Sequence, residues 1–197
     1  MRQGTLVTPP TGEPVDLDML KQHMRVSVTA DDGLITNYLI AARMFIEEGY
    51  DRALLTQTWD LTVDAFPWMD RGFTLPLWPL QSITSVTYYD INNSPTVWPS
   101  SNYFVDTVSR PGRLVLAFNA SWPTVSLRPA NAVVIRYVAG YGLPVDVPWN
   151  TKAAIMLLVE HWYETREPVM AQRGVNPAEM PFTVRSLLSQ HEIAGVS

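Results

Sequence analysis

The side chains of this sequence best suited to metal binding or acid–base catalysis are three histidines that lie far apart. They are His23, His161 and His191, and no two are spaced to share one face of a helix as metal ligands do. The chain contains no cysteine, so disulfide bonds, thiolate catalysis and cysteine metal sites are excluded. We therefore expect no metal and no cofactor, and interpret His161 as a residue at the edge of a helix.

Pairs of carboxylates that could act together as acid and base are few. Glu47 and Glu48 are consecutive in a predicted helix, so their side chains point about 100° apart. Asp60 and Asp64 share one face of a predicted strand, but at strand rise they lie roughly 13 Å apart, too far for a glycosidase pair. The two glutamates therefore do not converge, and we interpret the two aspartates as part of a solvated strand face.

Motifs for covalent catalysis and phosphate binding are missing as well. The sequence has no Gly-x-Ser-x-Gly elbow. Gly140-Tyr141-Gly142 follows a predicted strand, yet it lacks the third glycine of a dinucleotide site and the Lys-Ser/Thr of a P-loop. We interpret it as the turn by which the chain leaves a β region. The sequence predicts a protein that is not an enzyme; a site assembled from distant residues is an open alternative and would need a deep pocket with converging polar groups.

Composition places these side chains in a folded, acidic protein. Of 197 residues, 47% are hydrophobic and 17% charged, which is typical of a globular chain. Fourteen Lys and Arg against 19 Asp and Glu give a net charge of −5, which argues against a free-standing nucleic-acid binder. The beginning of the sequence lacks the apolar run of a signal peptide, and no stretch reaches the length of a membrane span. We expect a soluble cytoplasmic protein.

Helical patterns occupy both ends of the chain. Residues 1–16 form a predicted extended arm that is rich in proline. Asp16 is the predicted N-cap of a short helix from Leu17 to about Arg25, and a second helix begins at Asp31 or Asp32 and runs to about Tyr50. A third helix follows Pro148, and a last short one runs from Thr183 to about His191. The apolar stripe of the second helix consists of Ile35, Leu39, Ala42 and Ile46.

Between these helices the apolar period changes to two, which indicates strands. Trp59, Leu61 and Val63 alternate with polar residues. Further strands are predicted at 73–75, 83–89, 96–98, 103–106, 113–118 and 132–137. Each helical stripe needs a partner to bury it. We therefore predict one α+β domain over residues 1–197, in which helices from both ends form a small bundle and an antiparallel β region, about 56–142, is inserted.

Tryptophan is abundant beside the proline-containing loops. The residues concerned are Trp68, Trp78, Trp98, Trp122 and Trp149. Tryptophan is enriched in binding surfaces, so one alternative is a monomeric carbohydrate- or peptide-binding module. The other interpretation is that these rings cover the edges of a thin β region with a small core.

The order of these features resembles the phage head–tail connector family, in its longer branch with an inserted β region. The most distinctive stretch is Arg-Ala-Leu-Leu-Thr-Gln-Thr-Trp at residues 52–59. The other matching stretches are residues 14–26, 31–32, 34–43, 80–90, 136–142, 152–155 and 161–164. The resemblance spans nearly the whole chain, and the part beyond Arg166 is its least typical portion.

This resemblance implies a structural virion assembly protein without catalytic residues. It implies a homo-oligomeric ring, a dodecamer in the particle, between the portal protein and the tail or neck proteins. DNA would pass through its central channel without sequence-specific binding. The protein would be made in the cytoplasm of a bacterial host and located in the neck of a virion or phage-like particle.

The C-terminal segment suggests a docking element. A short helix is marginal by itself in water and must pack on something. We predict that the segment from about Glu167 onward contacts the portal or a neighbouring subunit through Phe182, Leu187 and Leu188. The alternative is that it folds back on the helices of its own chain.

Overall fold

The structure is a computed structural model that describes residues 4–67, 72–165 and 182–189. Its internal contacts divide the chain into two units. The sheet unit comprises residues 1–11 and 50–142, and the helical unit comprises residues 12–49 and 143–197. The chain therefore begins in the sheet unit, enters the helical unit, returns, and ends in the helical unit.

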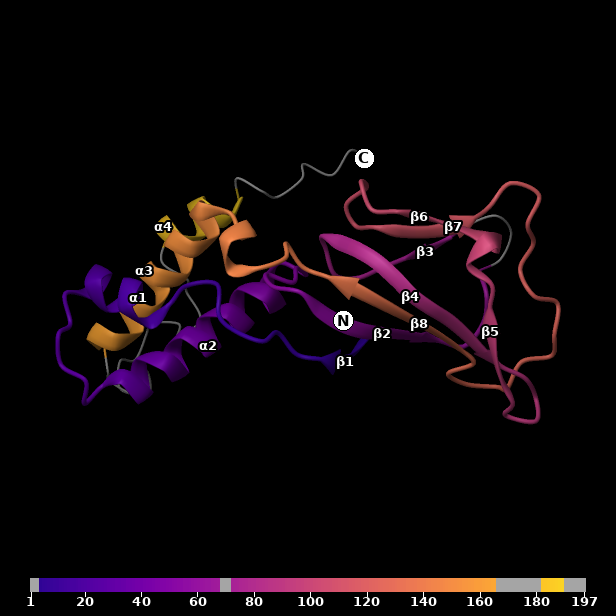
Figure 1. Cartoon of the computed structure of the whole chain (residues 1–197), viewed down its shortest axis with the longest axis horizontal. Coiled ribbons are helices and arrows are strands. Elements are labelled where there is room, and N and C mark those ends of the chain that lie inside the picture. Colours follow the sequence, from indigo (N-terminus) through magenta and orange to yellow (C-terminus); the bar gives the residue numbers. More distant parts are fainter. Residues whose placement is uncertain (1–3, 68–71, 166–181, 190–197) are drawn as a thin grey trace, which may run out of the picture. The chain divides into compact units, whose positions relative to one another are not determined.

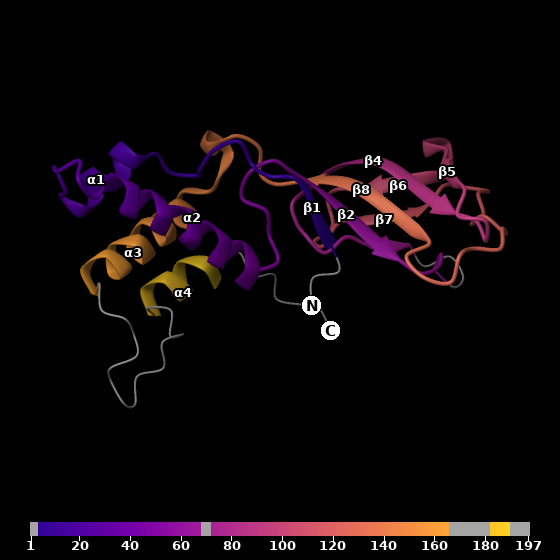
Figure 2. The same ribbon diagram turned by 90° about the horizontal axis from the view of Figure 1, so that it is seen from below.

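The helical unit brings together helices from both parts of the sequence. They are α1 (Leu17–Met24), α2 (Asp32–Gly49), α3 (Trp149–Thr165) and α4 (Phe182–Ser189). α3 packs against α1, α2 and α4, as Figures 1 and 2 show from two directions. The predicted stripe of α2 is buried as a whole, with at most 3% of any of its four side chains exposed. The predicted bundle is confirmed.

Local sequence explains where α1 begins and ends. The Asp16 carboxylate accepts a hydrogen bond from the Met19 N–H at 2.7 Å, which satisfies one of the free donors of the first turn. Arg25 adopts a left-handed conformation and its N–H bonds back to the Gln22 carbonyl, so the helix stops there. Leu20 lies fully buried between these ends.

The sheet unit contains two antiparallel sheets. The larger has the strand order β1-β2-β8-β4-β5, visible in Figure 2, and the smaller has the order β3-β7-β6. The strands are β1 (Gly4–Thr8), β2 (Gln57–Val63), β3 (Phe73–Thr74), β4 (Leu80–Tyr89), β5 (Pro95–Trp98), β6 (Tyr103–Asp106), β7 (Arg113–Leu116) and β8 (Val133–Ala139). The inserted antiparallel β region is thus confirmed.

The sheet also contains a strand that the sequence did not predict. β1, at the start of the predicted extended arm, pairs with β2 in antiparallel register, with Thr5 opposite Asp60 and Leu6 opposite Trp59. A strand of five residues is too short to give a clear periodic signal, and the prolines that follow suggest an irregular segment. Its partner lies more than fifty residues away, so only the folded chain reveals the pairing.

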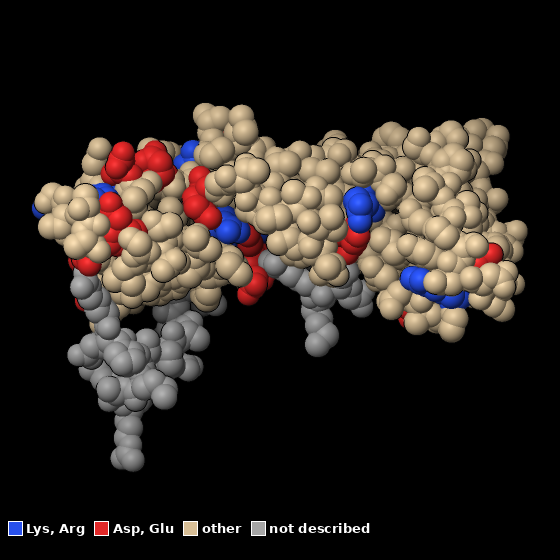
Figure 3. All heavy atoms as spheres, turned by 60° about the horizontal axis from the view of Figure 1, so that its bottom comes forward, with Lys and Arg blue, Asp and Glu red and all other residues tan. Residues whose placement is uncertain are grey.

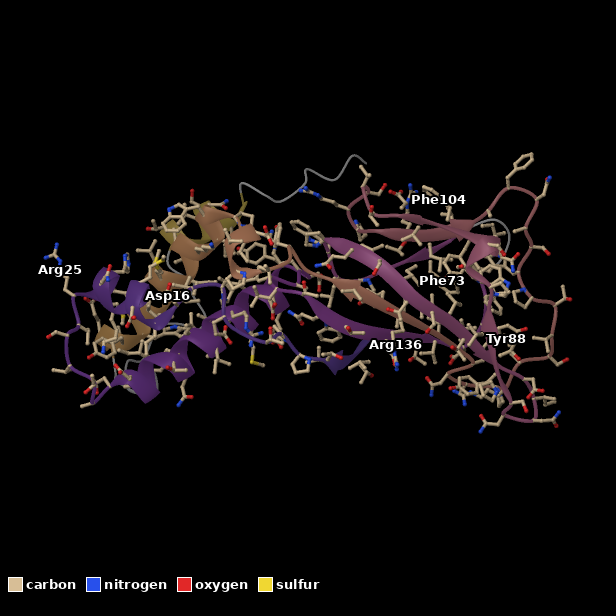
Figure 4. All side chains as sticks on the ribbon, viewed as in Figure 1. Asp16, Arg25, Phe73, Tyr88, Phe104 and Arg136 are labelled. Carbon is tan, nitrogen blue, oxygen red and sulfur yellow. The ribbon has the colours of Figure 1, made fainter. Side chains whose placement is uncertain are left out.

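The core of the sheet unit lies between the two sheets. Leu61 and Ile135 of the larger sheet and Leu114 of the smaller belong to one buried cluster. Phe66, Trp98 and Trp122 fill one side of it, with ring centroids 5.1 to 6.0 Å apart. Phe73 on β3 and Tyr88 on β4 are labelled in Figure 4. Both also contact the Phe66 ring, at 6.3 and 5.8 Å.

Candidate functional site

Each of the two described histidines lies on a helix of the helical unit. The Nε2 of His23 on α1 lies 3.2 Å from a carboxylate oxygen of Glu160 on α3, so it links two helices. His161 is exposed on α3, as expected for a residue at a helix edge. His191 lies outside the described residues. Over the described part of the chain, no three His, Cys, Asp or Glu side chains gather to hold a metal ion.

The two aspartates singled out by sequence accept hydrogen bonds from an arginine side chain and from a backbone N–H. Arg136 on β8, labelled in Figure 4, donates two hydrogen bonds of 2.8 Å to Asp60, one to each oxygen. Asp64 accepts a hydrogen bond of 2.7 Å from the Asn131 N–H. Both aspartates line an open hollow of about 510 Å³ beside Gly4 and Thr5. Since these oxygens bind groups of the sheet itself, they do not converge on a substrate.

Glu47 is buried, whereas its neighbour Glu48 is exposed. The carboxylate of Glu47 accepts a hydrogen bond of 2.9 Å from Nη1 of Arg43, one turn earlier on α2. Arg43 Nε donates at 2.8 Å to Glu13. Burial lowers the pKa of Arg43, but Glu13 and Glu47 raise it by more, so the net shift is upward and the charge is secure. The sequence analysis missed this network, although the four-residue spacing of Arg43 and Glu47 signals it.

Gly140-Tyr141-Gly142 is the turn that the sequence predicted at the end of the β region. Gly140 has a φ of 129°, and a Cβ atom there would lie 2.2 Å from the Leu55 carbonyl oxygen. Only glycine fits this position. Tyr141 packs edge-on against Trp78 at 6.0 Å, and burial raises the pKa of its hydroxyl. The turn is therefore an anchoring feature of the sheet unit, not a phosphate loop.

The loop tryptophans of the sheet unit belong largely to its interior. Trp78 and Trp98 are buried, and Trp122 is half-buried against Phe66. Arg52, which is 1% exposed, places its guanidinium 4.6 Å from the Trp78 ring centroid, and Arg110 lies 5.0 Å from it. This arrangement favours the interpretation of core-covering rings over a sugar-binding platform. Trp68 lies outside the described residues.

Large apolar side chains are exposed on both units. On the sheet unit they are Leu6, Val7, Ile91, Val97, Phe104, Val108, Phe118 and Val125. Phe118 is 95% exposed, in the long loop between β7 and β8. In the helical unit, Leu143 and Val145 are exposed at the short turn before α3, and Trp149, the first residue of α3, is exposed as well.

Charge is distributed unevenly between the units. The sheet unit contains seven basic and six acidic residues, whereas the helical unit contains seven basic and thirteen acidic residues. On the sheet unit, the face drawn in Figure 3 is mostly uncharged, and the blue and red atoms there lie side by side. Two ion pairs of the sheet unit are Asp60–Arg136 and Asp106–Arg113. Neither unit carries the excess of basic residues expected of a DNA-binding surface.

The predicted docking residues of the C-terminal segment lie on α4. Leu188 is fully buried, Leu187 is half-buried, and the side chain of Phe182 lies outside the described residues. α4 packs on α3, and Asn150 Nδ2 donates a hydrogen bond of 3.1 Å to the Leu187 carbonyl. Leu188 thus contributes to the core of its own helical unit. Partner contacts of these residues stay a prediction.

No described helix has the length and apolar character needed to cross a lipid bilayer. Among curated proteins, none matches the sequence.

Three solved chains of similar fold come from gene transfer agent particles. A chain in the neck of an empty gene transfer agent (GTA) particle, computed with C6 symmetry, matches with a TM-score of 0.75 and 24% identity. A chain in the virion of the native GTA particle matches with a TM-score of 0.76, and one in its neck, computed with C12 symmetry, with 0.72; both are 24% identical. Each match covers 96% of this chain and 94% of the other. These likenesses establish the shared fold.

A family model provides the sequence counterpart of this structural likeness. It describes the phage gp6-like head-tail connector protein and matches residues 14–104. That range contains α1, α2 and the first strands of the β region, and it includes the stretch at 52–59 on which the resemblance depended most. Residues 14–104 thus match the phage gp6-like head-tail connector protein, the model of a structural connector family, and this match confirms the resemblance inferred from the sequence.

Proposed function

We propose that this protein is a head–tail connector subunit in the neck of a phage-like particle, where its copies form a ring between the portal protein and the tail. The match of residues 14–104 to the connector family carries this proposal. The shared fold with GTA neck chains, solved with C6 and C12 symmetry, supports a ring of twelve copies.

The surface of the chain suits repeated contacts with copies of itself. A closed ring needs two different surfaces on each subunit, one complementary to the other. We infer that exposed apolar groups of the sheet unit, together with Leu143, Val145 and Trp149 of the helical unit, take part in these contacts. Charges of the sheet unit are in part already paired within the chain, as Asp106 and Arg113 show at 2.7 Å.

The charge of the chain suits a channel through which DNA passes. A subunit charge of −5 multiplies around a ring, and a ring that is acidic overall lacks the net basic charge that releases counterions from phosphates. Such a ring allows the duplex to slide without being held. We infer that DNA passes through the ring without sequence-specific binding.

We further propose that the C-terminal segment from about Glu167 contacts the portal or a neighbouring subunit, with Phe182, Leu187 and Leu188 as its apolar contacts. α4 is held to α3 in the single chain, and Leu187 retains an exposed part. Segments that adjust on docking are common in assembly proteins. Leu187→Glu should therefore reduce incorporation into particles, whereas Thr183→Glu, on an exposed position of the same helix, should not.

Electron microscopy of particles that lack or contain this chain tests the main proposal. Without the chain, filled heads and free tails should accumulate unjoined, and adding the purified chain should restore joined particles with a ring at the neck. Joined, infectious or transducing particles formed without the chain would refute the connector role. A density map of the neck in which the chain occupies no closed ring would refute the ring.

A further inference from the structure

The first strand of the sheet unit is attached to it in an unusual way. β1 belongs to the sheet unit by its contacts, but the residues that follow it, 12–49, belong to the helical unit. The sheet unit resumes only at Tyr50. Pairing with β2, and not chain connection, therefore holds β1 in its sheet.

β1 gains little from its own chain beyond this pairing. It is an edge strand with β2 on one side, and four of its five residues are exposed. Leu6 and Val7 remain 42% and 40% exposed. The register shifts between Leu6 and Thr8, so the pairing is irregular at the end where the strand leaves the sheet.

The link that follows β1 is short, extended and fixed at its far end. Pro9, Pro10 and Pro14 restrict it to extended conformations and disfavour a tight return. Glu13 is held by Arg43 at 2.8 Å, and Val15 is 2% exposed in the helical unit. The five Cα–Cα steps from Thr8 to Glu13 span at most about 18 Å.

We propose that β1 is exchanged in the ring, so that Gly4–Thr8 of one copy pairs with β2 of the neighbouring copy. The inference rests on the proposed ring. Exchange preserves every hydrogen bond of the β1–β2 register, because the partner strand is identical in each copy. The neighbour in a ring is present at high local concentration, so little is lost by pairing with it. Each subunit would then be tied to the next by a strand that belongs to both.

Engineered cysteines distinguish the two arrangements, since the chain has none of its own. Thr5 and Asp60 are directly opposite in the β1–β2 register, a separation that suits a disulfide bond. The full-length T5C/D60C variant is assembled into particles, its rings are verified by electron microscopy, and the sample is oxidised and run on a denaturing gel without reductant. Exchange predicts a ladder of linked chains above the monomer.

The matched control is D60C/R136C, whose positions face each other in the β2–β8 register of one chain. It removes the same Asp60–Arg136 ion pair and should run as a monomer under all conditions. A second sample mixes chains carrying only T5C with chains carrying only D60C before assembly. Linked dimers in that mixture can arise only between chains, and they are expected if β1 is exchanged.

The outcomes separate this inference from the proposed function. Rings in which T5C/D60C runs as an oxidised monomer, with no linked dimers in the mixed sample, would overturn the exchange and leave the connector ring intact. Joined particles whose necks contain no ring of this chain would overturn both.

Discussion

Arg43 on α2 binds the segment that enters the helical unit. Replacing Arg43 tests how much this contact contributes to the stability of the chain. Its guanidinium joins Glu13, which lies in the link after β1, to Glu47 on the same helix, at 2.8 and 2.9 Å. The exposed fractions of the three side chains are 11%, 20% and 8%, so this is a largely desolvated network. Arg43→Met retains the apolar stem and removes the charge.

The loss of stability that we expect for Arg43→Met follows from the burial of these side chains. Exposed ion pairs contribute about 0 to 1 kcal/mol, whereas removing one partner of a buried pair costs about 3 to 5 kcal/mol because a hydrogen-bonded counter-charge is taken from a desolvated group. With Glu47 only 8% exposed, we expect R43M to lower the free energy of unfolding by about 3 kcal/mol. Glu13→Gln should lower it by about 1 kcal/mol or less, because Glu13 is more exposed and Glu47 still accompanies Arg43.

The assay is urea unfolding of the full chain, followed by far-ultraviolet circular dichroism at pH 7. The double variant R43M/E47L replaces both charges by apolar groups and should recover part of the stability that R43M loses. Additive losses in R43M, E47L and their double variant would show that the two side chains are not coupled. An R43M loss no larger than that of E13Q would refute the buried-network reasoning.

Three further changes test other parts of the structure. Gly140→Ala should destabilise the sheet unit by several kcal/mol, because its Cβ would overlap a carbonyl oxygen at 2.2 Å, whereas Gly33→Ala, with open space around it, should not; thermal melting compares them. Leu39→Asp should unfold the helical unit, since the residue is 3% exposed, and Leu34→Asp on the same helix, 36% exposed, should melt close to the original chain. Hydrogen bonds from a serine and then an arginine hold the pKa of Asp106 below its ordinary value. The stability this carboxylate contributes is present above pH 4 and is lost as the pH falls through its folded pKa, so Asp106→Asn should flatten the acid limb of the pH–stability curve.

Local patterns in the sequence were sufficient for the helices and most strands. Asp16 acts as the predicted cap, the stripe containing Leu39 is buried, and β6 covers the predicted residues 103–106. These features depend on residues a few positions apart, where side-chain period and capping chemistry act directly. The connector resemblance depended on the same kind of information, an ordered series of local stretches.

The tertiary structure decided what depends on residues far apart in the chain. It paired β1 with β2, enclosed Trp78 and Trp98 in the sheet unit, and brought Glu13 to Arg43. A strand of five residues carries no clear periodic signal. The sequence pattern of a tryptophan beside a proline is the same whether the ring faces solvent or a core. Only the folded chain shows which distant backbone and which counter-charge each of these residues meets.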